Sequence, residues 1–395
     1  MLFSTQTLVG LFALFPTTFN IRALALPTDS FAVSDPNFAQ WNINEYSLSV
    51  ARSRLSAASA GNKIFFAGGI LKDSSISDII DVFDIETKTW SVQKLSSPRS
   101  EIGAGSFANG RFAVFAGGIG KETTLSPNVD VYDSQEDTWT VLKLTVPRIS
   151  PRIIDLGNIT AIHGGMLLSP PYISSQVDFL DSSYRITRTK KKILEYPVLG
   201  VAMSDPEDNI AIISGGFENR AGNSKFSDLQ PSNETLFVEH DPIDNRAKFF
   251  KAPLLDFPRW EISGAYSRDK YVLGGGYTLT EKGDTISTDV VNVFNGMTGA
   301  WQTNHLRLTT PRHSIFAGAV RGYVLFWGGA GSNVLDVYNP LTDSMVGNVP
   351  KNLYMKTSKA EAGYTTAKGC MIAVGGGLAP ESGTSDTVEI LNACY

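Results

Sequence analysis

Residues 98–146 read PRSEIGAGSFANGRFAVFAGGIGKETTLSPNVDVYDSQEDTWTVLKLTV, and this stretch decides the fold. It contains four short runs that are apolar or alternate between apolar and polar positions, at residues 100–108, 111–116, 129–133 and 138–144. Such runs predict β-strands. Turn-forming residues separate the runs, and the Asn109-Gly110 pair between the first two is a strong hairpin signal. The stretch therefore predicts four antiparallel strands in one twisted sheet.

The same unit recurs along the chain at intervals of roughly 50 residues. Each unit has a glycine pair, and the pairs begin at Gly68, Gly117, Gly164, Gly215, Gly274, Gly328 and Gly375. In three units an aromatic residue follows the pair and Trp stands seven positions later, as in Phe83 and Trp90, Tyr132 and Trp139, and Phe294 and Trp301. A four-stranded sheet repeated at this period predicts the blades of a β-propeller.

The combination of apolar run, double glycine, aromatic residue and spaced Trp resembles the kelch repeat. The resemblance covers residues 38–395 and implies an all-β fold, a seven-bladed kelch-type β-propeller. The blades are expected to start near residues 52, 98, 147, 197, 258, 311 and 358. We expect the glycines to end the second strand of each blade, where backbones crowd. The Trp on the outer strand should supply apolar contact between blades.

The two ends of the repeat region complement each other. Residues 38–42, which include Trp41, look like the fourth strand of a blade with no first three strands before it. The last unit has only three strands. We therefore expect the strand at residues 38–42 to complete the seventh blade, because this closure removes open sheet edges.

The N-terminus has the features of a secretory signal peptide. Residues 8–15 form a short apolar run, and Ala23-Leu24-Ala25 is an A-x-A cleavage site. The run is too short to span a bilayer. We expect residues 1–25 to be the signal peptide and residues 26–37 a short leader, so that the mature chain is secreted and extracellular.

Two further features fit an oxidising, extracellular compartment. Cys370 is expected to open the second strand of the last blade and Cys394 to end the third. Antiparallel pairing would then place the two cysteines side by side and allow a disulfide. Asn158 and Asn233 each begin an N-x-[ST] sequon and are predicted glycosylation sites.

Composition excludes some classes of partner. The chain has a net charge of −5 with 18% charged and 42% hydrophobic residues, which is ordinary for a soluble domain. No basic patch suggests nucleic acid, and no polybasic segment suggests a membrane surface. We expect a monomer whose partner is a protein or a glycan.

A basic residue repeats where the fourth strand of one blade leads into the first strand of the next. The set is Arg52, Arg99, Arg148, Arg259 and Arg312, and Lys359 takes the same place in the last unit. In kelch modules that capture acidic peptides, arginines near this face bind carboxylates. The resemblance thus suggests these five arginines as ligand-binding residues for an acidic partner, with their guanidiniums meeting at one end of the central channel. The alternative is that each arginine is part of the repeat's own structure.

Catalytic and metal-binding patterns are weak. Galactose oxidase, a secreted kelch enzyme, resembles this chain in blade pattern, but its copper site needs two histidines and two tyrosines, one of them crosslinked to a cysteine. In this chain the histidines are scattered, at His163, His240, His305 and His313. We predict no metal, no cofactor and no catalytic residue.

The sequence favours a secreted binding module for a protein or a glycan. Its ligand face would carry the connections between blades and the loops between second and third strands. A carbohydrate-active enzyme is the first alternative, because sialic-acid mutarotases are also kelch propellers, and Glu101, Glu261 and Glu361 stand near the start of inner strands. A structural cell-wall or matrix component is the second alternative.

Overall fold

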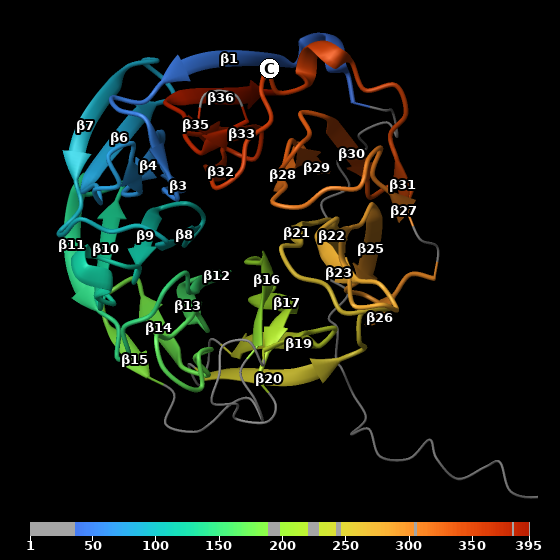
Figure 1. Ribbon diagram of the computed structural model, residues 1–395, viewed down its shortest axis with the longest axis horizontal. Coiled ribbons are helices and arrows are strands. Elements are labelled where there is room, and N and C mark those ends of the chain that lie inside the picture. Colours follow the sequence, from blue (N-terminus) through green and yellow to red (C-terminus); the bar gives the residue numbers. More distant parts are fainter. Residues whose placement is uncertain are drawn as a thin grey trace, which may run out of the picture. The chain divides into compact units, whose positions relative to one another are not determined.

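The strands form seven antiparallel sheets set around a common centre, as the blades of a β-propeller (Figure 1). The computed structural model describes residues 36–188, 198–219, 229–241, 246–303, 306–380 and 383–394. The predicted signal peptide, residues 1–25, lies outside this part of the chain. The all-β propeller expected from the repeat is confirmed.

Within each blade the strands follow one another from the centre of the ring outward. Blades one to three are β3 (Ser56–Ala60), β4 (Lys63–Ala67), β6 (Ile79–Asp84) and β7 (Trp90–Lys94); β8 (Gly103–Phe107), β9 (Phe112–Ala116), β10 (Asn128–Asp133) and β11 (Thr138–Lys143); and β12 (Arg152–Leu156), β13 (Ile159–His163), β14 (Val177–Asp181) and β15 (Ile186–Arg188). Blades four and five are β16 (Val198–Asp205), β17 (Ile210–Glu218), β19 (Thr235–Asp241) and β20 (Arg246–Ala252); and β21 (Ser263–Ser267), β22 (Lys270–Gly274), β25 (Val290–Asn295) and an outer strand split into β26 (Ala300–Trp301) and β27 (Leu306–Arg307). Blades six and seven are β28 (Phe316–Val320), β29 (Tyr323–Trp327), β30 (Leu335–Asn339) and β31 (Ser344–Met345); and β32 (Gly363–Ala367), β33 (Met371–Gly375), β36 (Thr387–Asn392) and β1 (Asn42–Ser47).

Smaller elements decorate this frame. Short strands pair outside the blades as β2 (Arg52–Ser53) with β5 (Ile70–Leu71), β23 (Tyr277–Leu279) with β24 (Thr285–Ser287), and β34 (Leu378–Ala379) with β35 (Gly383–Thr384), and β18 (Gln230–Pro231) extends blade four. Three 3-10 turns in the described residues are η1 (Phe38–Gln40), η2 (Lys121–Thr123) and η4 (Lys351–Leu353). No helix among these described segments is long and apolar enough to cross a membrane.

The ring closes through the N-terminal strand, although not at the residues predicted. β1 pairs with β36, from Asn42 opposite Asn392 to Ser47 opposite Thr387. Phe38–Gln40 is a 3-10 turn, so the expected strand at residues 38–42 is corrected to Asn42–Ser47. The pairing places Ile43 opposite Leu391, as Trp90 is opposite Phe83 in blade one, and Trp41 lies two residues ahead of that position.

Large aromatic side chains fill the contacts between blades. Between blades one and two, Phe65 lies 4.7 Å from Tyr132 and 5.6 Å from Trp139, measured between ring centroids. Trp41 serves the interface of blades six and seven in the same way, buried beside Trp327. The contact role predicted for the Trp positions is therefore correct, because each indole covers the apolar face of a neighbouring sheet.

The glycine pairs are required where one blade touches the next. Gly68 has a φ of 68°, and a Cβ there would lie 2.2 Å from the carbonyl oxygen of Arg99 in the following blade. No side chain fits this approach, and left-handed backbone favours glycine. In blades five and seven the left-handed pairs are Gly275–Gly276 and Gly376–Gly377, one residue beyond the pairs counted from the sequence.

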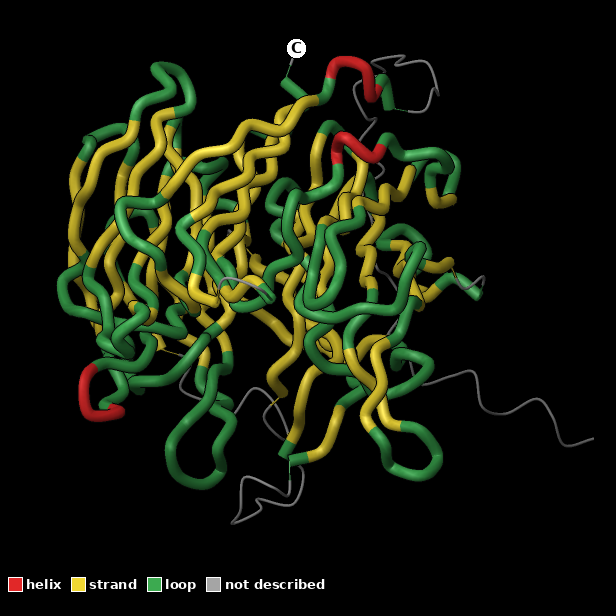
Figure 2. The backbone as a smooth tube through the Cα atoms, turned by 45° about the horizontal axis from the view of Figure 1, so that its top comes forward, coloured by secondary structure: helices red, strands yellow, loops and turns green. Residues whose placement is uncertain are grey.

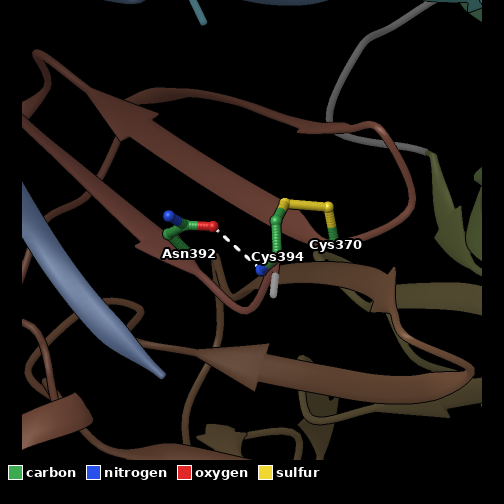
Figure 3. Close-up of a disulfide and its surroundings, with 3 residues drawn as sticks. All are labelled: Cys370, Asn392 and Cys394. Atoms are coloured by element: carbon green, nitrogen blue, oxygen red, sulfur yellow. Dashed lines mark hydrogen bonds between the residues drawn. A yellow bond between two sulfur atoms is a disulfide. The ribbon is translucent and has the colours of Figure 1, made fainter. Parts of the chain in front are cut away.

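A disulfide joins Cys370 and Cys394, with their Cα atoms 5.1 Å apart (Figure 3). It connects the turn before β33 to the residues that follow β36, and the Cys394 amide also donates to the side chain of Asn392. The predicted pairing is confirmed.

Strand alternation gives the propeller two different faces. The loops between second and third strands lie on the same face as the connections between blades, which we call the loop face. Backbone bridges join the two kinds of segment, as between Trp260 and Tyr277. The long loops project from one side of the molecule (Figure 2).

Candidate functional site

The five arginines predicted to bind a ligand are buried instead. Their exposed fractions are 0% for four of them and 1% for Arg312. Arg99 shows the arrangement: its Nη1 donates to the carbonyl oxygens of Gly117 at 2.8 Å and Asn128 at 2.9 Å, and its Nη2 pairs with Asp130. The guanidinium thus binds two strands of its own blade together.

Blades one, three, six and seven repeat this arrangement. The buried ion pairs are Arg52 with Asp81, Arg148 with Asp178, Arg312 with Asp336 and Lys359 with Glu389. In blade five Arg259 bonds Asn292 instead of a carboxylate. The expected convergence of Arg52, Arg99, Arg148, Arg259 and Arg312 at the channel is therefore wrong, and the acidic partner inferred from it loses its basis. Each guanidinium satisfies buried carbonyl oxygens within its blade, which is a structural role.

The residue two positions after each of these buried cations lies at the loop face. The set is Arg54, Glu101, Ser150, Glu261, Ser314 and Glu361, all with φ between 47° and 54°. Backbone bonds link neighbours of the set, because the amide of Arg54 donates to Glu361 and that of Glu101 donates to Arg54. We call these six residues the rim, since each stands just before an innermost strand. The left-handed backbone at Glu101 also explains why β8 starts at Gly103 and not at residue 100 as predicted.

Charges on one side of the rim are paired. Arg54 lies between two carboxylates, 3.0 Å from that of Glu361 and 3.3 Å from that of Glu101. Their side chains are 33% to 45% exposed, so solvent screens the pairs and each contributes little to stability. The two acids nonetheless already have a partner cation within the protein.

Arg152 and Tyr364 stand on the innermost strands around the centre of the ring, where the side chain of Arg152 is exposed and that of Tyr364 is half-buried. They come from innermost strands β12 and β32 of blades three and seven, and the Nε of Arg152 donates to the carbonyl oxygen of Gly200 at 3.0 Å. Desolvation by the surrounding strands lowers the pKa of Arg152, against the opposing effects of Tyr364 and Glu101. The sequence does not single out Arg152, because this residue belongs to no repeated motif.

Glu261 differs from the other two rim acids. Its side chain is exposed and accepts a hydrogen bond from the hydroxyl of Ser314 at 2.7 Å. Within the described residues no lysine, arginine or histidine forms an ion pair with it. Among the described residues, Glu261 is thus the one rim carboxylate that lies against no cation.

Aromatic side chains gather beside Glu261. Ring centroids are 5.5 Å apart for Phe217 and Trp260, 5.6 Å for Trp260 and Tyr277, and 3.9 Å for Tyr277 and His313. All four are half-buried, so part of each ring reaches the surface of the loop face. We call this set, which runs across blades four to six, the aromatic row.

The row occupies two fixed positions of the repeat. Phe217 and Tyr277 follow a glycine pair, where the other blades have Ile70, Ile119, Met166, Ala330 and Leu378. Trp260 and His313 follow the buried arginine, where the other blades have Ser53, Ser100, Ile149 and, after Lys359, Ala360. The row can be found from the sequence by comparing two positions between repeats, the residue after the glycine pair and the residue after the buried arginine. The other blades have no aromatic residue at either position.

Both ring nitrogens of His313 lie within hydrogen-bond distance of a hydroxyl group. Its Nε2 lies 2.7 Å from the hydroxyl of Tyr277, and its Nδ1 lies 3.1 Å from the hydroxyl of Ser287. Burial lowers the pKa of His313, although the charge of Glu261 acts in the opposite direction. His313 therefore orients Tyr277, and it forms no ion pair with Glu261.

The described histidines do not fit a copper centre. His163 is buried at the end of β13, His240 lies in β19, and His313 is on the loop face. His305 lies outside the described residues. Among those residues no three His, Cys, Asp or Glu side chains gather as metal ligands, and both cysteines are in the disulfide. No reaction step of this protein is therefore assigned to copper.

The two predicted glycosylation sites differ in their surroundings. Asn158 is exposed in the turn between β12 and β13, on the face opposite the loop face. Asn233 is half-buried, and its Nδ2 donates to the carbonyl oxygen of Leu255 at 3.2 Å. Both sites stay predictions.

Comparison with known proteins supports the architecture. Residues 51–94 match the model of the Kelch motif. No curated protein matches the sequence. A solved structure titled "Structure of YjhT" is 13% identical with a TM-score of 0.55, over 76% of this chain and 98% of that one. A fungal alcohol oxidase of the AA5 family, solved with copper, is 14% identical with a TM-score of 0.60, over 89% of this chain and 76% of that one. At this identity the likeness concerns the fold alone.

The seven four-stranded blades closed by an N-terminal strand define the class, a β-propeller. The Kelch motif at residues 51–94 and the repeat that continues from it support a propeller of the kelch-repeat type.

Proposed function

We propose that this protein is an extracellular carbohydrate-binding module and that the aromatic row is its binding surface. The observation that carries the proposal is the row itself, with Glu261 and the hydroxyl of Ser314 beside it. The disulfide and the predicted signal peptide support an extracellular location.

The chemistry of the row suits a sugar ring. One face of a pyranose presents C–H groups that pack on an aromatic ring, while its hydroxyls point outward to polar groups. Trp260 and Tyr277 would provide the apolar platform. Glu261 and Ser314 would accept and donate hydrogen bonds at the edge of this platform. Small-ligand sites commonly use a small number of such polar groups to orient the ligand.

Binding to a glycan array that contains neutral, acidic and amino sugars tests the proposal. We expect the mature protein to bind, and Tyr277→Ala to weaken binding about tenfold or more, as loss of a stacking platform does. Ile119→Ala is the matched control, because Ile119 has the same place in blade two and lies outside the row.

The array, run beside an assay for turnover of free sugars and alcohols and a binding assay with unglycosylated proteins, distinguishes the alternatives. Binding without turnover of free sugars supports the module. Turnover of a sugar or an alcohol would replace the module with a carbohydrate-active enzyme. Binding to proteins that carry no glycan, with no glycan bound, would make the ligand a protein. If nothing binds, the structural role in a wall or matrix stands in its place.

A further inference from the structure

The rim is electrically asymmetric. In blades seven, one and two, Arg54 lies against both Glu361 and Glu101. Both carboxylates on this side of the rim therefore have a cation beside them. In blades five and six the rim has Glu261 and Ser314, and no described cation pairs with Glu261.

Glu261, which lies against no cation among the described residues, stands beside aromatic side chains. Trp260 precedes Glu261 directly. Burial raises the pKa of Tyr277 and lowers that of His313, and the nearby charge of Glu261 adds to the first effect and opposes the second. Aromatic faces attract cations through the ring quadrupole, and Trp does so most strongly. A carboxylate and an indole face at one site both favour a positively charged ligand.

We propose that the glycan bound here carries a protonated amine, as an amino sugar without an acetyl group does, and that Glu261 binds this ammonium while Trp260 and Tyr277 pack on the ring. This inference rests on the proposed glycan binding. Charge complementarity selects the occupant: an ammonium would neutralise Glu261, whereas a carboxylate or sulfate at the same place would be repelled by it.

The test compares two oligosaccharides that differ only in acetylation. A β-1,4-linked glucosamine hexamer and its N-acetylated counterpart are titrated into the full mature chain by calorimetry, at mildly acidic pH where the sugar amines are protonated. We expect the free amine to bind about tenfold more tightly, since hydrogen bonds to charged groups are stronger than neutral ones.

Glu261→Gln isolates the carboxylate. It should weaken binding of the glucosamine hexamer about tenfold and leave the acetylated hexamer unchanged. Glu122→Gln is the control, because Glu122 is also exposed and lies on the loop face in blade two, away from the row. Because Glu261 is exposed, its variant should fold, and an unchanged melting temperature verifies this.

The outcomes separate the two proposals. If acetylated, neutral or acidic glycans bind as well as the free amine, or if Glu261→Gln binds the glucosamine hexamer normally, the amine proposal is overturned and glycan binding survives. If no glycan binds, both fall. If tetralysine binds with dependence on Glu261 and no glycan does, the ligand is a basic peptide and both are replaced.

Discussion

In each blade, two positions close together along the chain have different roles. Arg99 is buried, and both of its Nη atoms are bonded within its blade, whereas Glu101, two residues later, is part of the rim and partly exposed. A repeated cation in a sequence does not reveal which of these roles it has. Burial decides it, and burial depends on the acids and carbonyl groups that the blade brings around the side chain.

The buried arginines should be essential for stability. Arg99→Ala leaves Asp130 buried without its cation, which costs about 3–5 kcal/mol. Arg54→Ala, at the exposed rim, should cost less than about 1 kcal/mol. Chemical denaturation of the two variants measures the difference. Equal losses would contradict the structural role assigned to Arg99.

His163 should make the fold sensitive to acid. Its ring is fully buried without a hydrogen-bond partner, and desolvation, with Arg148 and Arg152 nearby, lowers its pKa from 6.5 to about 3. Between these values the unfolded chain binds a proton that the folded chain does not. Stability from this residue is therefore lost as pH falls from 6.5 toward 3.

His163→Leu removes the group that binds this proton in the unfolded chain. Denaturation midpoints measured from pH 7 down to pH 4 should fall less steeply for the variant than for the wild type. Parallel profiles would show that His163 is not the source of the acid sensitivity.

At the scale of elements, the sequence predicts strands well and their exact ends less well. Alternation and Asn109-Gly110 locate the hairpin of β8 and β9, because local turn chemistry sets that register. The predicted start of β8 is wrong, because Glu101 adopts a left-handed backbone that only the contacts with neighbouring blades impose. Trp41 has the spacing of a fourth-strand Trp, but the pairing of β1 gives that place to Ile43.

The candidate site is harder to predict than the fold. The five arginines repeat, and a search for repetition finds them. The aromatic row is found by its departure from the repeat at Phe217, Trp260, Tyr277 and His313. In the sequence Glu261 is only one of three acids near inner strands. That no cation of the described residues pairs with it depends on where Arg54 lies in space.

The disulfide should stabilise the last blade. It spans 24 residues of sequence, and the chain-entropy estimate for such a loop is about 3 kcal/mol. Cys370→Ser should lower the melting temperature and increase hydrogen exchange first in β33 and β36. Uniform loss of protection across all seven blades would show that the bond does not act locally.

At the scale of the molecule, stability depends on closing the ring. The innermost strands β3, β8, β12, β16, β21, β28 and β32 contact one another in a closed circle. Blade seven joins the two ends of the propeller, so its fourth strand closes a loop that contains the rest of the fold. Closing so long a loop has a cost in chain entropy.

Removing β1 should therefore affect blade seven before any other. A chain without Asn42–Ser47 exposes the edge of β36 and uncovers the contact at Trp327. We expect a lower melting temperature, a larger effect than that of Cys370→Ser, and proteolysis that starts in blade seven. Unchanged stability after this deletion would mean that the blade is completed in another way.

The pairing of β1 with β36 also sets how the propeller responds to mechanical tension. Asn42 and Asn392 are opposite each other, so the chain enters β1 and leaves β36 at the same end of the strand pair. Tension applied through the two termini would peel the interstrand bonds apart one after another and would not load them all together. Through the disulfide, force applied at the C-terminus passes from Cys394 to Cys370 and is not carried by β36. A molecule tethered at its N-terminus would consequently release β1 at low force while the other six blades stayed folded.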